Sequence, residues 1–310
     1  MTKRYTVYSE SLRKKYGEKT YKLPIKLDNT CPNRDGRIGT GGCSFCGESG
    51  GSFENLSPKL SVKEQLYRNR KYIASRYGAK KFIAYFQNYS NTYMPLPLFE
   101  EIMTEAAKED IVGLCLSTRP DCVNEKHLDF LENLSKKYSI DIIFELGLQS
   151  VNLEILRKYH RGHGIADYIR SVLRIKHRGF EICTHLIIGP KEEKREDIIE
   201  AAKLLSYLHT DEVKIHSLYI PKNTLMEKEY QRGKLEIIPL EEYVQRVVLF
   251  LRYLDPAIAV QRLVGRMPEE NTVFCNWGRS WWIIRDQIEE LLEEKKAFQG
   301  DLLEKDGILL

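Results

Sequence analysis

The chain has 310 residues, a formal net charge of +4 and a hydrophobic fraction of 42%. It contains no apolar run long enough to span a bilayer and no signal-peptide pattern at its start, which argues against membrane insertion and export. Seven cysteines, an odd number in a long chain, point to a reducing compartment, so we expect a cytoplasmic protein. The length suits one or two domains with a large core.

The predicted elements begin with a strand at 21–28, which a glycine-rich loop follows. A helix at 61–77 comes next, with Ser61 as its N-cap, Glu64 at the capping-box position and Gly78 at its end. Further along, β-branched and aromatic runs predict buried strands, and these alternate with helical patterns. The strands lie at 81–87, 111–118, 140–148, 181–188 and 213–219, and the helices between them include 98–108, 125–137 and 195–208.

Six strands that alternate with helices are typical of a parallel sheet buried on both faces. Such a sheet forms either a partial barrel or an open doubly wound structure. In both folds, functional sites form at the carboxyl ends of the strands, which is where the glycine-rich loop lies.

From Pro239 onward the alternation stops. A helix is predicted at 240–254, an added strand at 258–264 and a further helix at 281–296. We therefore expect a basic N-terminal extension at 1–20, the main α/β domain at 21–238, and a C-terminal α/β extension at 239–310 that packs on that domain.

Basic residues gather in the first thirty positions and again at 63–81, where they are interleaved with tyrosines. The second segment has seven basic residues against one acidic residue, Glu64. Basic side chains bind phosphates and tyrosines stack on bases, so both segments fit a nucleic-acid partner. A solvated helix face explains the same pattern equally well.

Three cysteines, Cys31, Cys43 and Cys46, lie in the glycine-rich loop with the spacing C-x11-C-x2-C. Three thiolates can hold three irons of a [4Fe–4S] cluster and leave the fourth iron open, whereas a closed cluster uses four cysteines. The alternative is zinc, which needs a fourth ligand, and neither 1–30 nor 47–114 contains a cysteine or histidine. The other four cysteines are expected to be core thiols, although Cys275 lies close to Trp281 and Trp282.

This loop resembles the cluster loop of the radical S-adenosylmethionine (SAM) superfamily, and the surrounding sequence resembles its YtqA/YhcC-like branch. The usual superfamily spacing is C-x3-C-x2-C, and the longer first gap suits that branch. The resemblance implies a partial (β/α)6 TIM-like barrel in place of an open sheet. It also implies two cofactors, a [4Fe–4S] cluster held by the three cysteines and SAM.

The resemblance further implies residues that contact SAM. Gln149 lies in a G-x-Q-S segment and is expected at the ribose or methionyl end, and Arg161 in R-G-H is expected at the SAM carboxylate. His185 and Ile187 lie in a strand that resembles G-x-I-x-G-x-x-E and are expected at ribose and adenine. Thr118, in S-T-R-P-D, is expected near the sugar.

One departure from the family pattern concerns the second strand, where the usual G-G-E is absent and 87–93 reads Q-N-Y-S-N-T-Y. Asn88 is expected to supply an acceptor for the SAM amino group there, and a simple polar turn is the alternative. The other positions also have structural alternatives. Gln149 could be a satisfied buried amide, Arg161 a cation at a helix C-terminus and Ile187 part of the strand core. Thr118 could belong to a type I turn.

The resemblance implies that a 5′-deoxyadenosyl radical made from SAM abstracts a hydrogen atom from the substrate. In the YtqA-like branch it implies conversion of 5-carboxymethylaminomethyl-(2-thio)uridine to the 5-aminomethyl form at the tRNA wobble position. The expected partners are a tRNA anticodon stem-loop and an electron donor such as flavodoxin or ferredoxin. The alternatives are a radical SAM enzyme for a small metabolite or peptide, and a zinc-binding nucleic-acid-binding protein.

Overall fold

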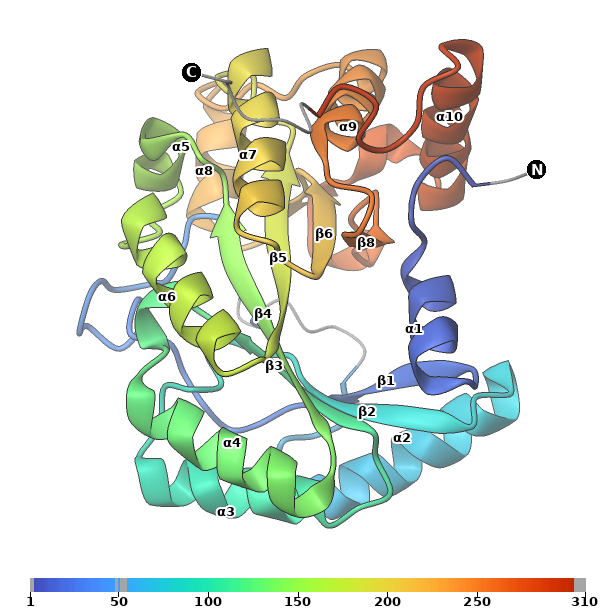
Figure 1. Cartoon of the computed structure of the whole chain (residues 1–310). Coiled ribbons are helices and arrows are strands. Elements are labelled where there is room, and N and C mark those ends of the chain that lie inside the picture. Colours follow the sequence, from blue (N-terminus) through green and yellow to red (C-terminus); the bar gives the residue numbers. More distant parts are fainter. Residues whose placement is uncertain (1–2, 48–49, 51–54, 304–310) are drawn as a thin grey trace, which may run out of the picture.

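A seven-stranded parallel sheet organises the computed structural model, which describes residues 3–47, 50 and 55–303. The order along the sheet is β1-β2-β3-β4-β5-β6-β8, and every neighbouring pair is parallel. The sheet curls into a half-barrel (Figure 1). Its strands are β1 (Thr20–Ile25), β2 (Lys81–Phe86), β3 (Gly113–Thr118), β4 (Asp141–Gln149), β5 (Glu181–Ile188), β6 (Glu212–Ser217) and β8 (Ala259–Arg262).

The partial TIM-like barrel is thus confirmed, and the open doubly wound alternative is wrong. The six predicted strands are all present, and the added strand predicted at 258–264 joins the same sheet as β8, beside β6.

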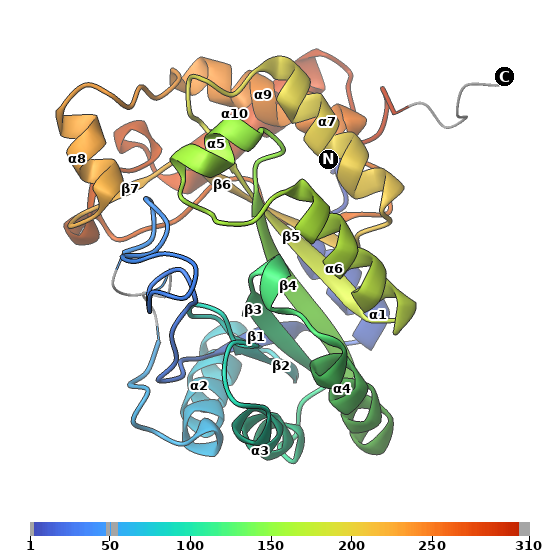
Figure 2. The same cartoon turned by 90° about the vertical axis from the view of Figure 1, so that its left-hand side faces the viewer.

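Helices cover the convex side of the sheet (Figures 1 and 2). They are α2 (Val62–Tyr77), α3 (Leu96–Ala107), α4 (Glu125–Tyr138), α6 (Ile165–His177), α7 (Arg195–Tyr207) and α9 (Leu240–Tyr253), with α10 (Trp281–Glu294) packed on α9. The short helix α5 (Leu153–Lys158) packs instead through Ile155 on Ile187 and Leu218. Short 3-10 turns lie at Pro120–Cys122, Glu269–Asn271 and Asn276–Gly278.

Side chains along the strands alternate between two cores. In β2, Phe82, Ala84 and Phe86 face the helices, whereas Ile83 and Tyr85 face the interior of the barrel. This alternation places polar side chains inside the barrel without disturbing the apolar layer under the helices.

The start of α2 shows how the sequence fixes a helix boundary. The Ser61 hydroxyl accepts a hydrogen bond from the backbone N–H of Glu64 at 3.2 Å, and Gly78 ends the helix in the left-handed conformation with φ 63°. The Glu64 carboxylate pairs with Arg68 one turn later, so only the Ser61 half of the predicted capping box is observed.

Helix α1 (Tyr8–Tyr16), which the sequence did not predict, lies between the two edge strands β1 and β8 (Figure 1). Leu12 packs against Ile83 and Tyr85 inside the barrel, and the N–H of Val260 donates to the carbonyl of Thr6 at 2.8 Å.

Cations of the N-terminal segment pair with acidic groups of the chain: Lys3 with Glu289, Arg4 with Glu293, Lys15 with Asp141 and Glu181, and Lys22 with Glu145. This segment therefore fills one end of the barrel. Residues 1–2 and 304–310, the outer ends of the two predicted extensions, lie outside the described residues.

Three further unpredicted elements follow β6: β7 (Ile220–Pro221), α8 (Leu225–Gln231) and β9 (Thr272–Phe274), which pairs antiparallel with β7. They border the loop that carries the three cysteines (Figure 2). The N–H of Met226 donates to the Ser44 carbonyl at 3.0 Å, and the N–H of Ser44 donates to the Tyr159 carbonyl at 3.0 Å. The cysteine loop is thus fixed to two separate parts of the fold.

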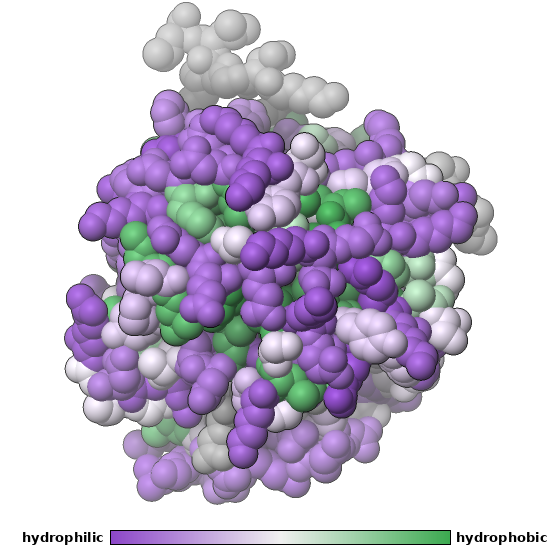
Figure 3. Space-filling view, turned by 90° about the horizontal axis from the view of Figure 1, so that it is seen from below, coloured by the Kyte–Doolittle hydropathy of each residue, from purple (hydrophilic) through white to green (hydrophobic). Residues whose placement is uncertain are grey.

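The face that contains α3 and α4 is mostly hydrophilic, with hydrophobic side chains scattered between polar ones (Figure 3). Within 3–47 and 55–303, each helix is too short or too polar to cross a membrane.

Candidate active site

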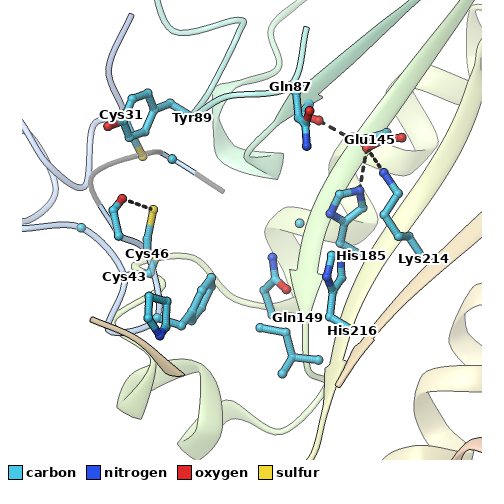
Figure 4. Close-up of a pocket in the computed structure, with 18 of the residues that line it drawn as sticks. Cys31, Cys43, Cys46, Gln87, Tyr89, Glu145, Gln149, His185, Lys214 and His216 are labelled. Carbon is cyan, nitrogen blue, oxygen red and sulfur yellow. Dashed lines mark hydrogen bonds and ion pairs between the residues drawn. The ribbon is translucent and has the colours of Figure 1, made fainter. Parts of the chain in front are cut away.

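A cavity of about 520 Å³ opens at the carboxyl ends of the strands and brings the predicted site residues together. Its lining includes the three cysteines and five of the six residues expected to contact SAM: Thr118, Gln149, Arg161, His185 and Ile187. In Figure 4 the cysteines lie on one side, the side chains of β5 and β6 on the other, and Gln149 between them. Residues from five separate segments thus share one cavity, as the strand-end argument predicts.

The three cysteines are free thiols on a tightly bent loop. Cys31 and Cys43 are buried and Cys46 is half-buried. Gly42 has φ 86°, and a Cβ there would lie 3.0 Å from the Arg34 guanidinium, so glycine is required at this bend. Burial raises the pKa of Cys46 to about 12, which disfavours a bare thiolate, whereas a metal ion deprotonates a coordinating thiol outright.

Two buried guanidinium groups beside this loop fit an anionic metal–thiolate group. Arg161 Nη1 donates to Cys43 Sγ at 3.2 Å, and its Nε has no hydrogen-bond partner among the described residues. Arg119 pairs with Asp121 through two hydrogen bonds, and its buried Nη1 is likewise without a partner in the described chain. Unused buried donors of this kind need an acceptor, and a thiolate-ligated cluster provides one.

The spacing of the sulfur atoms separates a cluster from a single zinc ion. Tetrahedral zinc with Zn–S bonds of about 2.3 Å requires sulfurs roughly 3.8 Å apart. In the described part of the chain, one group of three possible metal ligands has all its donor atoms within 4.8 Å of one another. It consists of Glu145, Cys183 and His185, and the loop cysteines do not form such a group. In this arrangement the three sulfurs are not all within reach of one zinc ion.

Gln149 is held in a strained backbone conformation at the end of β4. Its φ is 76°, which is uncommon for a residue with a side chain, and the β4–β5 register shifts between Gly147 and Gln149. A Cβ at Gly147 would lie 2.8 Å from Gln149 Nε2 and 3.0 Å from Arg161 Nη2. The glycine of the G-x-Q-S segment thus makes room for both side chains, and strain of this kind is typical of functional sites.

Arg161 is fixed by its neighbours. Its Nη2 donates to the Gly147 carbonyl at 2.7 Å and contacts His163 Nε2 at 2.8 Å. Burial and the charge of Arg161 lower the pKa of His163 to about 2, so His163 is a neutral partner.

The remaining predicted residues lie along the same wall. Thr118 shares hydrogen bonds with Ser90 at 2.9 Å and Thr92 at 2.6 Å. Ile187 is buried within the lining. His185 Nε2 lies 2.8 Å from Glu145 Oε2, and burial lowers the pKa of His185 to about 4, so the imidazole is neutral near pH 7.

Asn88 is the exception, because it lies behind the cavity wall. Its side-chain oxygen accepts from the N–H of Leu27 at 3.0 Å, and its Nδ2 donates to the Leu27 carbonyl at 2.8 Å and to Asn29. The neighbouring residues Gln87 and Tyr89 line the cavity in its place. The structure thus gives Asn88 a part in joining the ends of β1 and β2.

The sequence reasoning missed a buried network around Glu145, which is inaccessible to solvent. Its carboxylate accepts from Lys22 at 2.6 Å, Lys214 at 2.7 Å and Tyr85 at 2.5 Å. Burial opposes ionisation, but Lys214 and Lys22 outweigh it and hold the pKa of Glu145 well below its usual value. Because two lysines occupy the carboxylate, Glu145, Cys183 and His185 are better described as part of an ion-pair network than as a metal site. The sequence signal that could have revealed this network is Glu145 itself, a charged residue inside an otherwise apolar strand.

The cavity wall formed by β6 and the C-terminal segment was also missed. It adds His216, Tyr219, Arg262 and Arg266 to the lining. Among the described residues, the lining contains six basic side chains, Arg34, Arg119, Arg161, Lys214, Arg262 and Arg266, and one carboxylate, that of Glu145.

The half-barrel, the strand-end cavity and the three-cysteine loop define an iron–sulfur enzyme with an open coordination position. The sequence matches the model of the radical SAM superfamily over residues 31–205 and that of the radical SAM C-terminal domain over 210–294. The chain therefore belongs to the radical SAM superfamily. Its cofactors are a [4Fe–4S] cluster and SAM, and enzymes of this superfamily need an electron donor.

Relatives of similar length support this assignment. The chain is 33% identical over 306 residues to the uncharacterized protein YtqA of Bacillus subtilis, covering 98% of this chain and 94% of YtqA. It is 31% identical to the protein YhcC of Escherichia coli K12, covering 98% and 96%. A tRNA uridine(34) acetyltransferase of Methanocaldococcus infernus is 29% identical over 161 residues, 50% of this chain and 28% of that protein.

Among solved structures, the archaeal Elp3 of Methanocaldococcus infernus with an N-terminal deletion has a TM-score of 0.68 at 17% identity. The match covers 90% of this chain and 64% of that one, and it shows a shared fold.

Proposed function

We propose that this protein is a radical SAM enzyme that modifies the tRNA wobble uridine, converting 5-carboxymethylaminomethyl-(2-thio)uridine to the 5-aminomethyl form. The observation that carries the proposal is the charge of the cavity: among the described residues six cations line it, and the one carboxylate there is already paired with Lys22 and Lys214. Such a cavity favours anions. Both the RNA backbone and the carboxymethyl group of this substrate are anionic. The similarity to a tRNA uridine(34) acetyltransferase supports the choice of nucleoside.

In this proposal Cys31, Cys43 and Cys46 ligate the cluster. When bound, the cluster and SAM supply a 5′-deoxyadenosyl radical that abstracts hydrogen from the carboxymethyl group. Arg161 binds the SAM carboxylate, and Gln149 binds its ribose or methionyl end.

The other wall residues complete the SAM site. Thr118 and His185 face the sugar and Ile187 covers the adenine. Gln87 and Tyr89 take the place that the sequence assigned to Asn88, because they reach the cavity and Asn88 does not.

Helix α2 supplies the RNA surface in this proposal. Tyr67 and Tyr72 are 62% and 55% exposed, and the Arg76 guanidinium lies over the rings of Tyr72 and Tyr77 at 5.6 Å. The helix spans about 24 Å, so its face fits the stem of an anticodon stem-loop whose wobble base is splayed into the cavity. The N-terminal cations contribute less, because four of them, Lys3, Arg4, Lys15 and Lys22, are paired with acidic groups of the chain.

We further place the protein in the cytoplasm with flavodoxin or ferredoxin as the electron donor. All seven cysteines are free thiols in the structure, as a reducing compartment requires.

Nucleoside mass spectrometry of tRNA from cells that lack the gene tests the proposal. We expect 5-carboxymethylaminomethyl-uridine to accumulate, and the wild-type gene, but not its Cys43→Ala variant, to restore the aminomethyl form. An unchanged nucleoside profile contradicts the proposal and leaves a small metabolite or peptide as the substrate. Affinity for the anticodon stem-loop should also fall with salt, with a log–log slope of about 0.7 per phosphate contact.

A further inference from the structure

Arg262 is a half-buried cation that lines the cavity. Within the described part of the chain, its guanidinium forms neither an ion pair nor a side-chain hydrogen bond. The other arginines of the inner cavity differ in this respect, since Arg161 is bonded to Cys43 and Gly147 and Arg119 to Asp121. The Arg262 guanidinium is therefore available to an anionic ligand in the cavity, with which it could form charge-assisted hydrogen bonds.

The sheet is distorted where Arg262 enters the cavity. The pairing between β6 and β8 shifts register after Val213, so Lys214 pairs with Arg262 and Gln261 is the additional residue. Gln261 reaches Glu145 and Glu212 inside the barrel, and Arg262 also lines the cavity. In a regular strand these neighbours would face opposite sides, so the bulge directs both inward.

His216 provides a second unused polar group beside Arg262. Its Nε2 is buried and has no hydrogen-bond partner among the described residues. Burial and the positive charge of Arg262 hold the pKa of His216 well below its usual value, so the ring is neutral. A neutral imidazole with hydrogen on Nε2 can donate to an anion. Lys214 is near both groups, but its ammonium is already bonded to Glu145 and Tyr85.

His216 lies across the cavity from the cysteine loop. Figure 4 shows His216 and Lys214 on the wall opposite Cys31, Cys43 and Cys46, with Gln149 between the two walls. Gln149, one of the expected SAM contacts, lies between His216 and the cysteines, so we assign an anion held beside His216 to the second ligand of the cavity. One guanidinium offers two parallel N–H donors, which match the two oxygens of a carboxylate.

We propose that Arg262 and His216 form an anion subsite that binds the carboxylate of the substrate group from which hydrogen is abstracted. The subsite rests on the function proposed above and specifies which part of the substrate is recognised. The enzyme then distinguishes the carboxymethyl substrate from its aminomethyl product by the charge that the product lacks.

Equilibrium binding to two anticodon stem-loop RNAs tests the subsite. The RNAs differ only at the wobble position, where one carries 5-carboxymethylaminomethyluridine and the other its carboxamide. The protein is reconstituted with cluster and SAM, and no reductant is added. Hydrogen bonds to charged groups contribute about 1.5–3 kcal/mol, so we expect wild-type protein to prefer the acid by about 10-fold or more.

The variants separate this subsite from general charge attraction. Arg262→Gln is expected to bind both RNAs equally, and Arg262→Lys to keep a reduced preference for the acid. Arg266→Gln removes another cavity arginine, one that stacks on Trp281 at 3.5 Å, and is expected to keep the full preference even where total affinity falls.

The outcomes distinguish the two proposals. Equal binding of both RNAs by the wild type, or an unchanged preference in folded Arg262→Gln, overturns the subsite and leaves tRNA as the substrate. If Arg262→Gln does not fold, a full preference in Arg262→Lys overturns it, because the lysine lacks the paired donors. A wild type that binds neither RNA overturns the proposed function, and the subsite with it.

Discussion

The Glu145→Gln substitution probes the buried network that supports the cavity wall. It preserves the shape of the side chain and removes its charge, which leaves the Lys214 ammonium without an ion-pair partner among the described residues and leaves Lys22 with only the carboxylate of Glu212, 3.9 Å away. The Lys22 and Lys214 side chains are 12% and 6% exposed and the Glu145 side chain is fully buried, so solvent cannot compensate. Removing one partner from a buried ion pair costs about 3–5 kcal/mol. At roughly 2 °C per kcal/mol for a large chain, this lowers Tm by about 6–10 °C.

Urea and thermal denaturation followed by circular dichroism measure this loss. Glu64→Gln is the matched control, because it breaks the exposed Glu64–Arg68 pair on α2 and should change stability by about 0.5 kcal/mol or less. The depressed pKa of Glu145 adds a second readout. The stabilisation from the Glu145 charge is complete above the unfolded pKa of about 4.5 and disappears as pH falls through the folded pKa. The free energies of unfolding of wild type and Glu145→Gln should therefore converge in acid. A loss below about 1 kcal/mol at pH 7 refutes the reasoning.

The remaining predictions concern the cluster, the SAM wall and a buried acid. Cys43→Ala should abolish cluster assembly, measured as iron content and absorbance near 400 nm, since two thiolates cannot hold the cluster. Gly147→Ala should weaken SAM binding, measured by equilibrium dialysis, because its Cβ would displace Gln149 and Arg161. Burial raises the pKa of Glu193 to about 8 and that of Glu212 to about 7, so wild-type stability should fall as pH rises from about 5 to 8, and Glu193→Gln should reduce this slope in urea denaturation.

Each of these predictions has a contradicting result. Intact iron content in Cys43→Ala removes that residue from the ligand set. For the cavity wall, Gly164→Ala is the control, because its Cβ would meet only Leu153 at 3.9 Å, and equal SAM affinity in the two alanine variants contradicts the steric argument. A Glu193→Gln variant with the wild-type pH slope shows that another group is responsible.

The sequence predicted those features that local patterns determine. The six strands were recognisable because each is a buried run rich in β-branched and aromatic residues, and the cysteine loop because its spacing is specific. Helix α1 was missed because it is short and polar, and Leu12 is its one buried residue. Its role depends on the gap between β1 and β8, which no local pattern encodes.

Single side-chain positions were harder to predict than elements. Asn88 and its neighbours occupy a turn in which Tyr89 has φ 52°, so the side that each residue faces does not follow from strand alternation. Arg262 reaches the cavity because of a bulge, and such a shift between strands is invisible in the sequence. The Glu145 network contains hydrogen bonds between residues up to 129 positions apart, so its pairing required the folded barrel.

The central claim is that this cavity presents the carboxymethyl group of a tRNA wobble uridine for hydrogen abstraction. The most direct test is the transfer of deuterium from tRNA that carries 5-carboxymethylaminomethyl-uridine deuterated at the carboxymethyl carbon. With reconstituted protein, SAM and reductant, the account predicts that 5′-deoxyadenosine acquires deuterium while the nucleoside becomes 5-aminomethyluridine. Unlabelled 5′-deoxyadenosine with an unchanged nucleoside would contradict it.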